Sequence, residues 1–153
     1  MDEMSAAPGR RDQRASASWV GYPLVRGIVV HGDGRGRMMG YPTANVAVTA
    51  GHTLPVDGVY AGTYGRPDES WHPALISLGR RPTFHERSRR ILEVHLLDFD
   101  ETLYGEHAAV TFVSWLRYQQ RFDSAAGLIR QIGLDVGAAR GALAARGWTG
   151  AAG

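Results

Sequence analysis

The sequence predicts a mainly β fold, in which six strands close into an antiparallel barrel and one C-terminal helix packs on it. From Val25 onward, short runs of β-favouring residues alternate with turns rich in Gly, Pro and Asp, a spacing typical of barrels. After Phe122, apolar residues recur at helical spacing instead. A length of 153 residues suits one domain, and 44% apolar residues suffice for a sizeable core.

The strands are expected where a β-favouring run stands between turn residues. Their expected ranges are 25–30, 44–48, 58–64, 73–78, 90–99 and 108–116. The helix is expected after Asp123 or Ser124, either of which can cap its first turn. Its apolar stripe consists of Leu128, Ile129, Ile132, Val136, Ala139 and Leu143. Glycines within this stretch each cost about 1 kcal/mol relative to Ala, so the helix should depend on docking against the barrel.

The two ends of the chain are expected to lack fixed structure. Residues 1–18 are small, polar and charged, and they bury too little surface to offset the entropy of ordering, so we expect a disordered tail. The barrel and its helix are expected to occupy residues 19–146. A flexible C-terminus is expected over residues 147–153.

Composition excludes several classes of protein. The absence of Cys excludes disulfide scaffolds, thiolate nucleophiles and Cys-based zinc sites. All 17 basic residues are Arg, which excludes enzymes that need a P-loop Lys or a Schiff base. The net charge of +2 argues against a nucleic-acid partner, and no apolar run is long enough to span a membrane. Because the N-terminus also lacks a signal-peptide pattern, we expect a cytoplasmic protein.

A glycine-rich segment follows the first expected strand. Gly32, Gly34 and Gly36 let the backbone bend and bring N–H groups close to an anion, and Arg37 adds forked donors for phosphate oxygens. No helix is expected after this loop, so it is not a Rossmann fingerprint. The spacing alone fits a phosphate-binding loop and equally fits a flexible hairpin loop.

The tetrapeptide Pro-Thr-Ala-Asn at 42–45 comes next. Pro42 favours extended backbone at Tyr41, and extended backbone places Thr43 and Asn45 on the same side. A hydroxyl and an amide oxygen side by side are hard ligands suited to Mg²⁺. The alternative is a turn in which both side chains bond only to local backbone.

The fifth expected strand places a carboxylate and an imidazole on one face. Alternation separates Glu93 and His95 from the apolar face of Leu92, Val94 and Leu96. Such a pair suits a catalytic base and its partner, and it equally suits a solvated face. Between the last strand and the helix, the aromatic residues and Arg117 of segment 115–123 suit either a site for a planar heterocycle or a strand–helix junction core.

Together these segments resemble the riboflavin kinase family. The matching segments are GIVVHGDGRGRMMGYPTAN, LPVDGVYAG, SLGRRPTF, LEVHLLDFDETLYGE and LRYQQRFDSAAGLI, in the family's order and with closely similar spacing. The resemblance implies a Greek-key path for the barrel. It also implies ATP- and Mg²⁺-dependent phosphorylation of the ribityl 5′-hydroxyl of riboflavin, which yields FMN and ADP. We expect a monomer that acts on these small molecules, without a nucleic-acid or membrane partner.

The resemblance also assigns roles to residues of this sequence. It assigns nucleotide binding to Gly32, Gly34, Gly36, Arg37, Thr43 and Asn45. Thr43 and Asn45 would in addition bind Mg²⁺. Glu93 corresponds to the proposed base for the ribityl hydroxyl, and Arg117 corresponds to an arginine in a loop near the flavin.

Two departures from the family pattern bear on function. Most bacterial members carry this module behind an FMN adenylyltransferase domain, which this sequence does not show, so the chain is expected to stop at FMN. Arg80, Tyr118 and Gln119 stand where bacterial relatives often have different residues, which makes a modified flavin an alternative substrate. The sequence is also compatible with a non-catalytic flavin- or nucleotide-binding module and, last, with a barrel that binds single-stranded nucleic acid.

Overall fold

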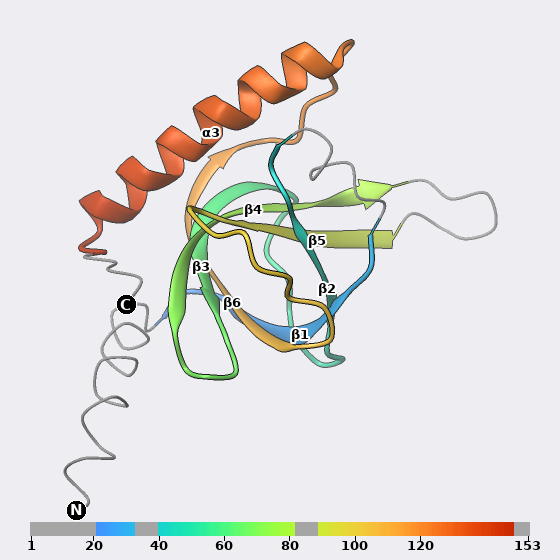
Figure 1. Ribbon diagram of the computed structural model, residues 1–153, viewed down its shortest axis with the longest axis vertical. Coiled ribbons are helices and arrows are strands. Elements are labelled where there is room, and N and C mark those ends of the chain that lie inside the picture. Colours follow the sequence, from blue (N-terminus) through green and yellow to red (C-terminus); the bar gives the residue numbers. More distant parts are fainter. Residues whose placement is uncertain (1–20, 33–39, 82–88, 149–153) are drawn as a thin grey trace, which may run out of the picture.

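The computed structural model describes residues 21–32, 40–81 and 89–148 as a barrel with one long helix lying along its side (Figure 1). The elements are β1 (Leu24–Val30), β2 (Ala44–Val48), β3 (Gly58–Gly65), β4 (Trp71–Arg81), β5 (Arg89–Leu96), β6 (His107–Arg117) and α3 (Ala125–Ala145). This architecture confirms the predicted barrel with a C-terminal helix.

The barrel closes in the order β1-β2-β5-β4-β3-β6, and every neighbouring pair of strands is antiparallel. The chain crosses to the opposite side of the barrel between β2 and β3 and again between β5 and β6, which gives the Greek-key path. Because strand direction alternates, the end of β1, the start of β2 and the β5–β6 connection share one end of the barrel. The β6–α3 connection leaves from the opposite end.

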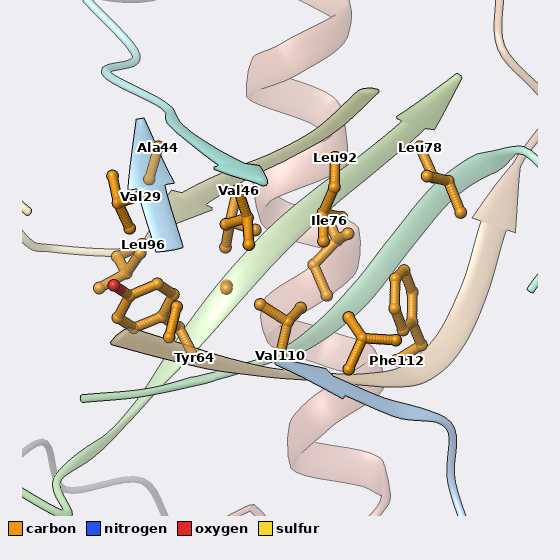
Figure 2. Packing of buried hydrophobic residues seen from close by; sticks show 14 of the residues in the cluster. Val29, Ala44, Val46, Tyr64, Ile76, Leu78, Leu92, Leu96, Val110 and Phe112 are labelled. Atoms are coloured by element: carbon orange, nitrogen blue, oxygen red, sulfur yellow. The ribbon is translucent and has the colours of Figure 1, made fainter. Parts of the chain in front are cut away.

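Two apolar clusters stabilise the fold. The first fills the barrel, where side chains from all six strands point toward one another, including Val29, Val46, Tyr64, Ile76, Leu92 and Val110 (Figure 2). The second lies between the outer face of the barrel and α3 and consists of Val59, Ala61, Leu75, Leu97, Val113, Ala139 and Leu143. Alternate residues of the strands thus serve an inner and an outer core. The outer core provides the docking that the glycine-rich helix requires.

The ends of α3 have specific caps. The Oγ of Ser124 accepts a hydrogen bond from the N–H of Gly127 at 3.0 Å, so Ser124 is the N-cap. At the other end Gly147 adopts a left-handed φ of 90°, and the N–H of Trp148 donates to the carbonyl of Leu143 at 2.9 Å. The fully buried apolar residues of α3 lie in its C-terminal half. Its N-terminal half borders a cavity instead.

Some expected boundaries differ from the structure. The strand expected over 90–99 ends at Leu96, because Asp98 adopts a left-handed φ of 57° that breaks the extended backbone. Ile129, expected in the apolar stripe, is 37% exposed. The expected tail at 1–18 and residues 149–153 lie outside the described residues. Within the described ranges, no helix combines the length and apolar character needed to cross a membrane.

Candidate active site

Glu93 lies at the centre of a polar row on the outer face of the barrel. Asn45 of β2 and Ser77 of β4 lie directly opposite Glu93 on the two neighbouring strands. Val94, the next residue along β5, is fully buried in the barrel, so alternation turns the polar row outward. Thr43, just before β2, donates a hydrogen bond from Oγ1 to Oε2 of Glu93 at 3.4 Å. Three residues singled out in the sequence, Thr43, Asn45 and Glu93, therefore lie together.

A cavity of about 550 Å³ separates this part of the barrel from the N-terminal half of α3. Its apolar wall is formed by Val59, Leu75, Phe122, Leu128 and Ile132. Its polar wall includes Tyr41, Thr43, Glu93, His95 and Arg117. A cavity of this size, with one apolar wall and many polar and charged groups around it, can hold a small organic ligand that carries both apolar and polar parts.

A second and smaller cavity, about 60 Å³, lies at the end of the barrel shared by β1, β2 and the β5–β6 connection. Its lining includes Gly32, Thr43 and Asn45, together with Phe99 and residues 101–104 of the β5–β6 connection. Thr43 also borders the larger cavity, so its side chain stands where the two cavities meet. Glu93, hydrogen-bonded to Thr43, lies at this junction.

The side chain of Asn45 packs closely against the backbone at Gly32. A Cβ added at Gly32 would lie only 1.9 Å from Nδ2 of Asn45. The described start of the glycine-rich loop therefore packs directly on a candidate phosphate ligand. The remaining predicted nucleotide residues of this loop, Gly34, Gly36 and Arg37, lie outside the described residues.

Arg117 borders the larger cavity and is held by a buried carboxylate. Its Nε and Nη2 donate to the carboxylate oxygens of Asp135 at 3.0 and 2.7 Å. Asp135, whose side chain is 6% exposed, also accepts a hydrogen bond from Nε2 of Gln131 at 2.9 Å. The guanidinium of Arg117 lies 5.9 Å from the ring centroid of Phe122. The predicted flavin residue is thus a link between the end of β6 and α3.

His95 contacts the segment that precedes β2. Its Nδ1 lies 2.8 Å from the carbonyl oxygen of Pro42, and because a carbonyl only accepts, Nδ1 carries the hydrogen. The ring of His95 also stands edge-on to the ring of Tyr41, with the centroids 5.6 Å apart. Burial lowers the pKa of His95, which favours the neutral ring.

A network that sequence reasoning missed lies beside the smaller cavity. Glu106 accepts hydrogen bonds from the hydroxyl of Tyr64 at 2.9 Å and from Nη2 of Arg66 at 3.0 Å. The guanidinium of Arg66 lies 5.3 Å from the ring centroid of Phe99, a residue of the smaller cavity. Burial, together with the bond to Glu106, raises the pKa of Tyr64. These partners are more than 30 residues apart, so no local pattern signals them.

The aromatic segment after β6 divides between two roles. The ring of Trp115 packs edge-on against those of Tyr60 and Tyr118 and lies where a Cβ on Gly58 would be. Phe122 instead borders the larger cavity. Nε2 of Gln119 donates to Oγ of Ser77 at 2.8 Å, which ties this segment to β4 beside the polar row.

Oxygen atoms of neutral side chains are the candidate metal ligands. Within the described ranges, His, Asp and Glu side chains do not gather in groups of three or more that would hold a metal ion. The side chains of Thr43 and Asn45 both border the smaller cavity. A hydroxyl and an amide oxygen suit Mg²⁺ when phosphate oxygens and water complete its shell. The oxygens of Thr43 and Asn45 therefore suit a Mg²⁺ ion that binds together with a nucleotide.

The fold and the site define a class of protein: a Greek-key barrel in which one residue, Thr43, borders two cavities and donates a hydrogen bond to a carboxylate, Glu93. Comparison with known families is specific. The family model described as Flavokinase, riboflavin kinase, matches residues 21–143. The chain belongs to the riboflavin kinase family, as its motifs predict.

Individual relatives agree with this membership. The bifunctional riboflavin kinase/FMN adenylyltransferase of Listeria monocytogenes is 38% identical over 117 residues, which cover 76% of this chain and 37% of the relative. A Bacillus subtilis protein named RNA-binding riboflavin kinase RibR is 34% identical over 113 residues, which cover 74% of this chain and 48% of the relative. This chain therefore spans less than half the length of these two relatives.

A solved structure gives the same result for the fold. Riboflavin kinase from Trypanosoma brucei is similar with a TM-score of 0.56 and 25% sequence identity. The match covers 81% of this chain and 82% of that one.

Proposed function

We propose that this protein transfers the γ-phosphoryl group of ATP to the ribityl 5′-hydroxyl of riboflavin, giving FMN and ADP. The observation that carries the proposal is the position of Glu93 beside Thr43, the residue that borders both cavities. Substrates bound in the two cavities would meet at this carboxylate, and most of the catalysis of phosphoryl transfer comes from such positioning. Family membership supports the choice of the two substrates.

The larger cavity takes the flavin. Its apolar side chains, Phe122, Leu128 and Ile132 among them, suit the faces of an isoalloxazine ring. Its polar wall at Glu93 suits the hydroxyl groups of the ribityl chain. Arg117, held at the edge of this cavity by Asp135, is the proposed flavin-contacting arginine.

The smaller cavity takes the phosphate end of the nucleotide. Thr43 and Asn45 would hold Mg²⁺ together with phosphate oxygens, and this ion would neutralise charge that develops on the phosphates. Gly32 keeps the loop backbone close to Asn45. On sequence grounds, Gly34, Gly36 and Arg37 continue the nucleotide site and take the role that Lys has in many other kinases.

Glu93 acts as the base in the proposed reaction. As the ribityl oxygen forms its bond to the γ-phosphorus, the carboxylate of Glu93 accepts the hydroxyl proton. The bond from the γ-phosphorus to the β–γ bridging oxygen breaks, and its electron pair leaves with ADP. Thr43, which donates to Glu93, keeps the carboxylate oriented toward the cavity junction.

The direct test is incubation of the purified chain with riboflavin, ATP and MgCl₂, followed by chromatographic separation of flavins and nucleotides. We expect FMN and ADP in equal amounts and no FAD. Glu93→Gln is the matched control, since it keeps the shape of the side chain and removes the base. Riboflavin that binds without conversion to FMN would favour the non-catalytic binding module. Flavins modified on the ring, assayed in parallel, test the alternative substrate.

One relative is named an RNA-binding riboflavin kinase, so the expected absence of a nucleic-acid partner also has a test. The small net charge of +2 supports that expectation. We expect no retardation of labelled single-stranded RNA by the protein at low salt. Retardation that disappears as salt is raised would add an RNA partner.

A further inference from the structure

We propose that His95 is a positioning residue, which fixes the segment from Tyr41 to Thr43 so that Thr43 can serve both cavities. This inference rests on the proposed function. His95 lies on the same outward face as Glu93, two residues further along β5. From there it reaches the segment that bears Thr43, where it contacts Pro42 and Tyr41.

The segment from Tyr41 to Thr43 lies outside the β-sheet. Backbone pairing between β2 and β5 begins at Ala44, which lies opposite Val94. Pro42 has no N–H and donates no backbone hydrogen bond. Gly40, just before the segment, has a left-handed φ of 86°, so the chain turns there. Side chains therefore have to hold these residues against β5.

Among the described residues, the hydrogen bond from His95 to this segment is shorter than the one between Thr43 and Glu93. The Nδ1–H of His95 donates to the carbonyl of Pro42 at 2.8 Å, a normal hydrogen-bond length. The bond from Thr43 to Glu93 is 3.4 Å long and correspondingly weaker. The ring of Tyr41 packs edge-on against the imidazole at a centroid distance of 5.6 Å and adds an apolar contact. His95 thus fixes the backbone, and Thr43 is positioned as a result.

A small displacement of Thr43 has a large expected effect. Misplacing a reacting or metal-binding group by about 1 Å costs on the order of 100-fold in rate. His95 itself needs no contact with the phosphate and takes no proton in this account. Although His95 borders the larger cavity, its loss displaces a candidate metal ligand and should reduce the use of Mg·ATP more than the binding of riboflavin.

The test compares two amides in place of the imidazole. His95→Asn places Nδ2–H where Nδ1–H of the imidazole was, and we expect it to keep at least about a third of the wild-type kcat/KM for Mg·ATP. His95→Gln extends its amide past the Pro42 carbonyl, and His95→Phe has no donor, so both should lose about 10- to 100-fold. Because His95 borders the larger cavity, riboflavin affinity, measured by flavin fluorescence, can change in each variant, but in His95→Gln it should change much less than the kcat/KM for Mg·ATP.

The matched control is His52→Phe, because His52 accepts a backbone hydrogen bond from Arg26 and lines neither cavity. We expect wild-type kinetics in this variant. Equal activity of His95→Asn and His95→Gln would overturn the proposal, even if His95→Phe failed to fold.

A readout without turnover separates this inference from the proposed function. Amide hydrogen exchange of the peptide that contains residues 41–45 should be faster in His95→Gln than in His95→Asn and wild type. Unchanged exchange would overturn the positioning role, whatever the activity. Absence of FMN from the wild-type assay would instead overturn the proposed function while faster exchange still supported the anchoring of the segment.

Discussion

The guanidinium of Arg117 and the buried carboxylate of Asp135 connect the end of β6 to α3 by hydrogen bonds of 2.7 and 3.0 Å. The pair lies on the wall of the larger cavity, between the β6–α3 connection and the N-terminal half of the helix. Apolar docking of α3 is concentrated in its C-terminal half, at Ala139 and Leu143. The ion pair therefore holds the helix where it borders the proposed flavin site.

Asp135→Asn should destabilise the protein by about 2–4 kcal/mol, because it leaves Arg117 without its charged partner in a partly buried position. The free energy of unfolding in urea, followed by circular dichroism, measures this loss. Asp98→Asn is the matched control, since Asp98 is 74% exposed where it pairs with Arg140. That variant should lose less than about 1 kcal/mol. Equal losses would contradict the role given to the buried pair.

Gly32→Ala should raise the KM for Mg·ATP by about tenfold or more, a cost of roughly 1.4 kcal/mol in binding. The added Cβ meets Nδ2 of Asn45, so either the loop or the amide must move. Steady-state kinetics at saturating riboflavin measure the change. Gly141→Ala, in open space on α3, should keep wild-type kinetics and gain up to about 1 kcal/mol of stability. An unchanged KM for Mg·ATP in Gly32→Ala would show that Asn45 is not part of the nucleotide site.

Thr43→Ala should weaken the use of Mg·ATP far more than the binding of riboflavin. The substitution removes a candidate metal ligand and the hydrogen bond to Glu93 together. We expect kcat/KM for Mg·ATP to fall at least tenfold, with riboflavin affinity by fluorescence changed less than about threefold. Thr49→Ala, an exposed site beyond β2, is the control and should behave as wild type. Similar losses for both ligands would assign Thr43 a structural role only.

His72 should make stability depend on pH. Burial lowers its pKa below the ordinary value of 6.5. As the pH falls through 6.5, the unfolded chain takes up a proton before the folded protein does, so the free energy of unfolding decreases. The stability linked to His72 is therefore fully present above pH 6.5, and it is lost as the pH falls toward the lower pKa that His72 has in the folded protein.

Urea unfolding at pH 7.5 and pH 5.5 tests this dependence. His72→Gln keeps a donor for Oγ of Ser70, whose own hydrogen goes to Asp68 at 2.6 Å, and it cannot titrate. We expect the variant to lose less stability than wild type between these pH values. An identical pH dependence in the two proteins would show that His72 titrates normally.

Much of the fold was predictable because its signals are local. Alternation within runs and turn residues between them place the strands, and Ser124 with the apolar spacing places the helix. The Greek-key path came from the family resemblance, since strand order depends on contacts distant in sequence. The premature end of β5 at Leu96 follows from the left-handed backbone of Asp98, which a run of apolar residues does not reveal.

The site was predictable in part for the same reason. Thr43 and Asn45 are two residues apart, and alternation within β5 turns Glu93 outward, so each side chain could be oriented from sequence. The hydrogen bond from His95 to Pro42 joins residues 53 positions apart, so it could not be predicted from the sequence. Asp135 did carry a signal: it is a carboxylate three residues after Ile132 and four before Ala139, on the buried side of α3. Its partner is Arg117, which the sequence does not distinguish from Arg121 in the same junction.

The most direct test of the central claim is turnover by Glu93→Gln. The account predicts that this variant folds, binds riboflavin with an affinity within about threefold of wild type, and forms FMN about 10²- to 10⁴-fold more slowly, the range expected when a general base is removed. Rapid-quench measurement of FMN formation with both substrates saturating gives the rate of the chemical step. Formation of FMN at the wild-type rate by Glu93→Gln would contradict the assignment of Glu93 as the base at the junction of the two cavities.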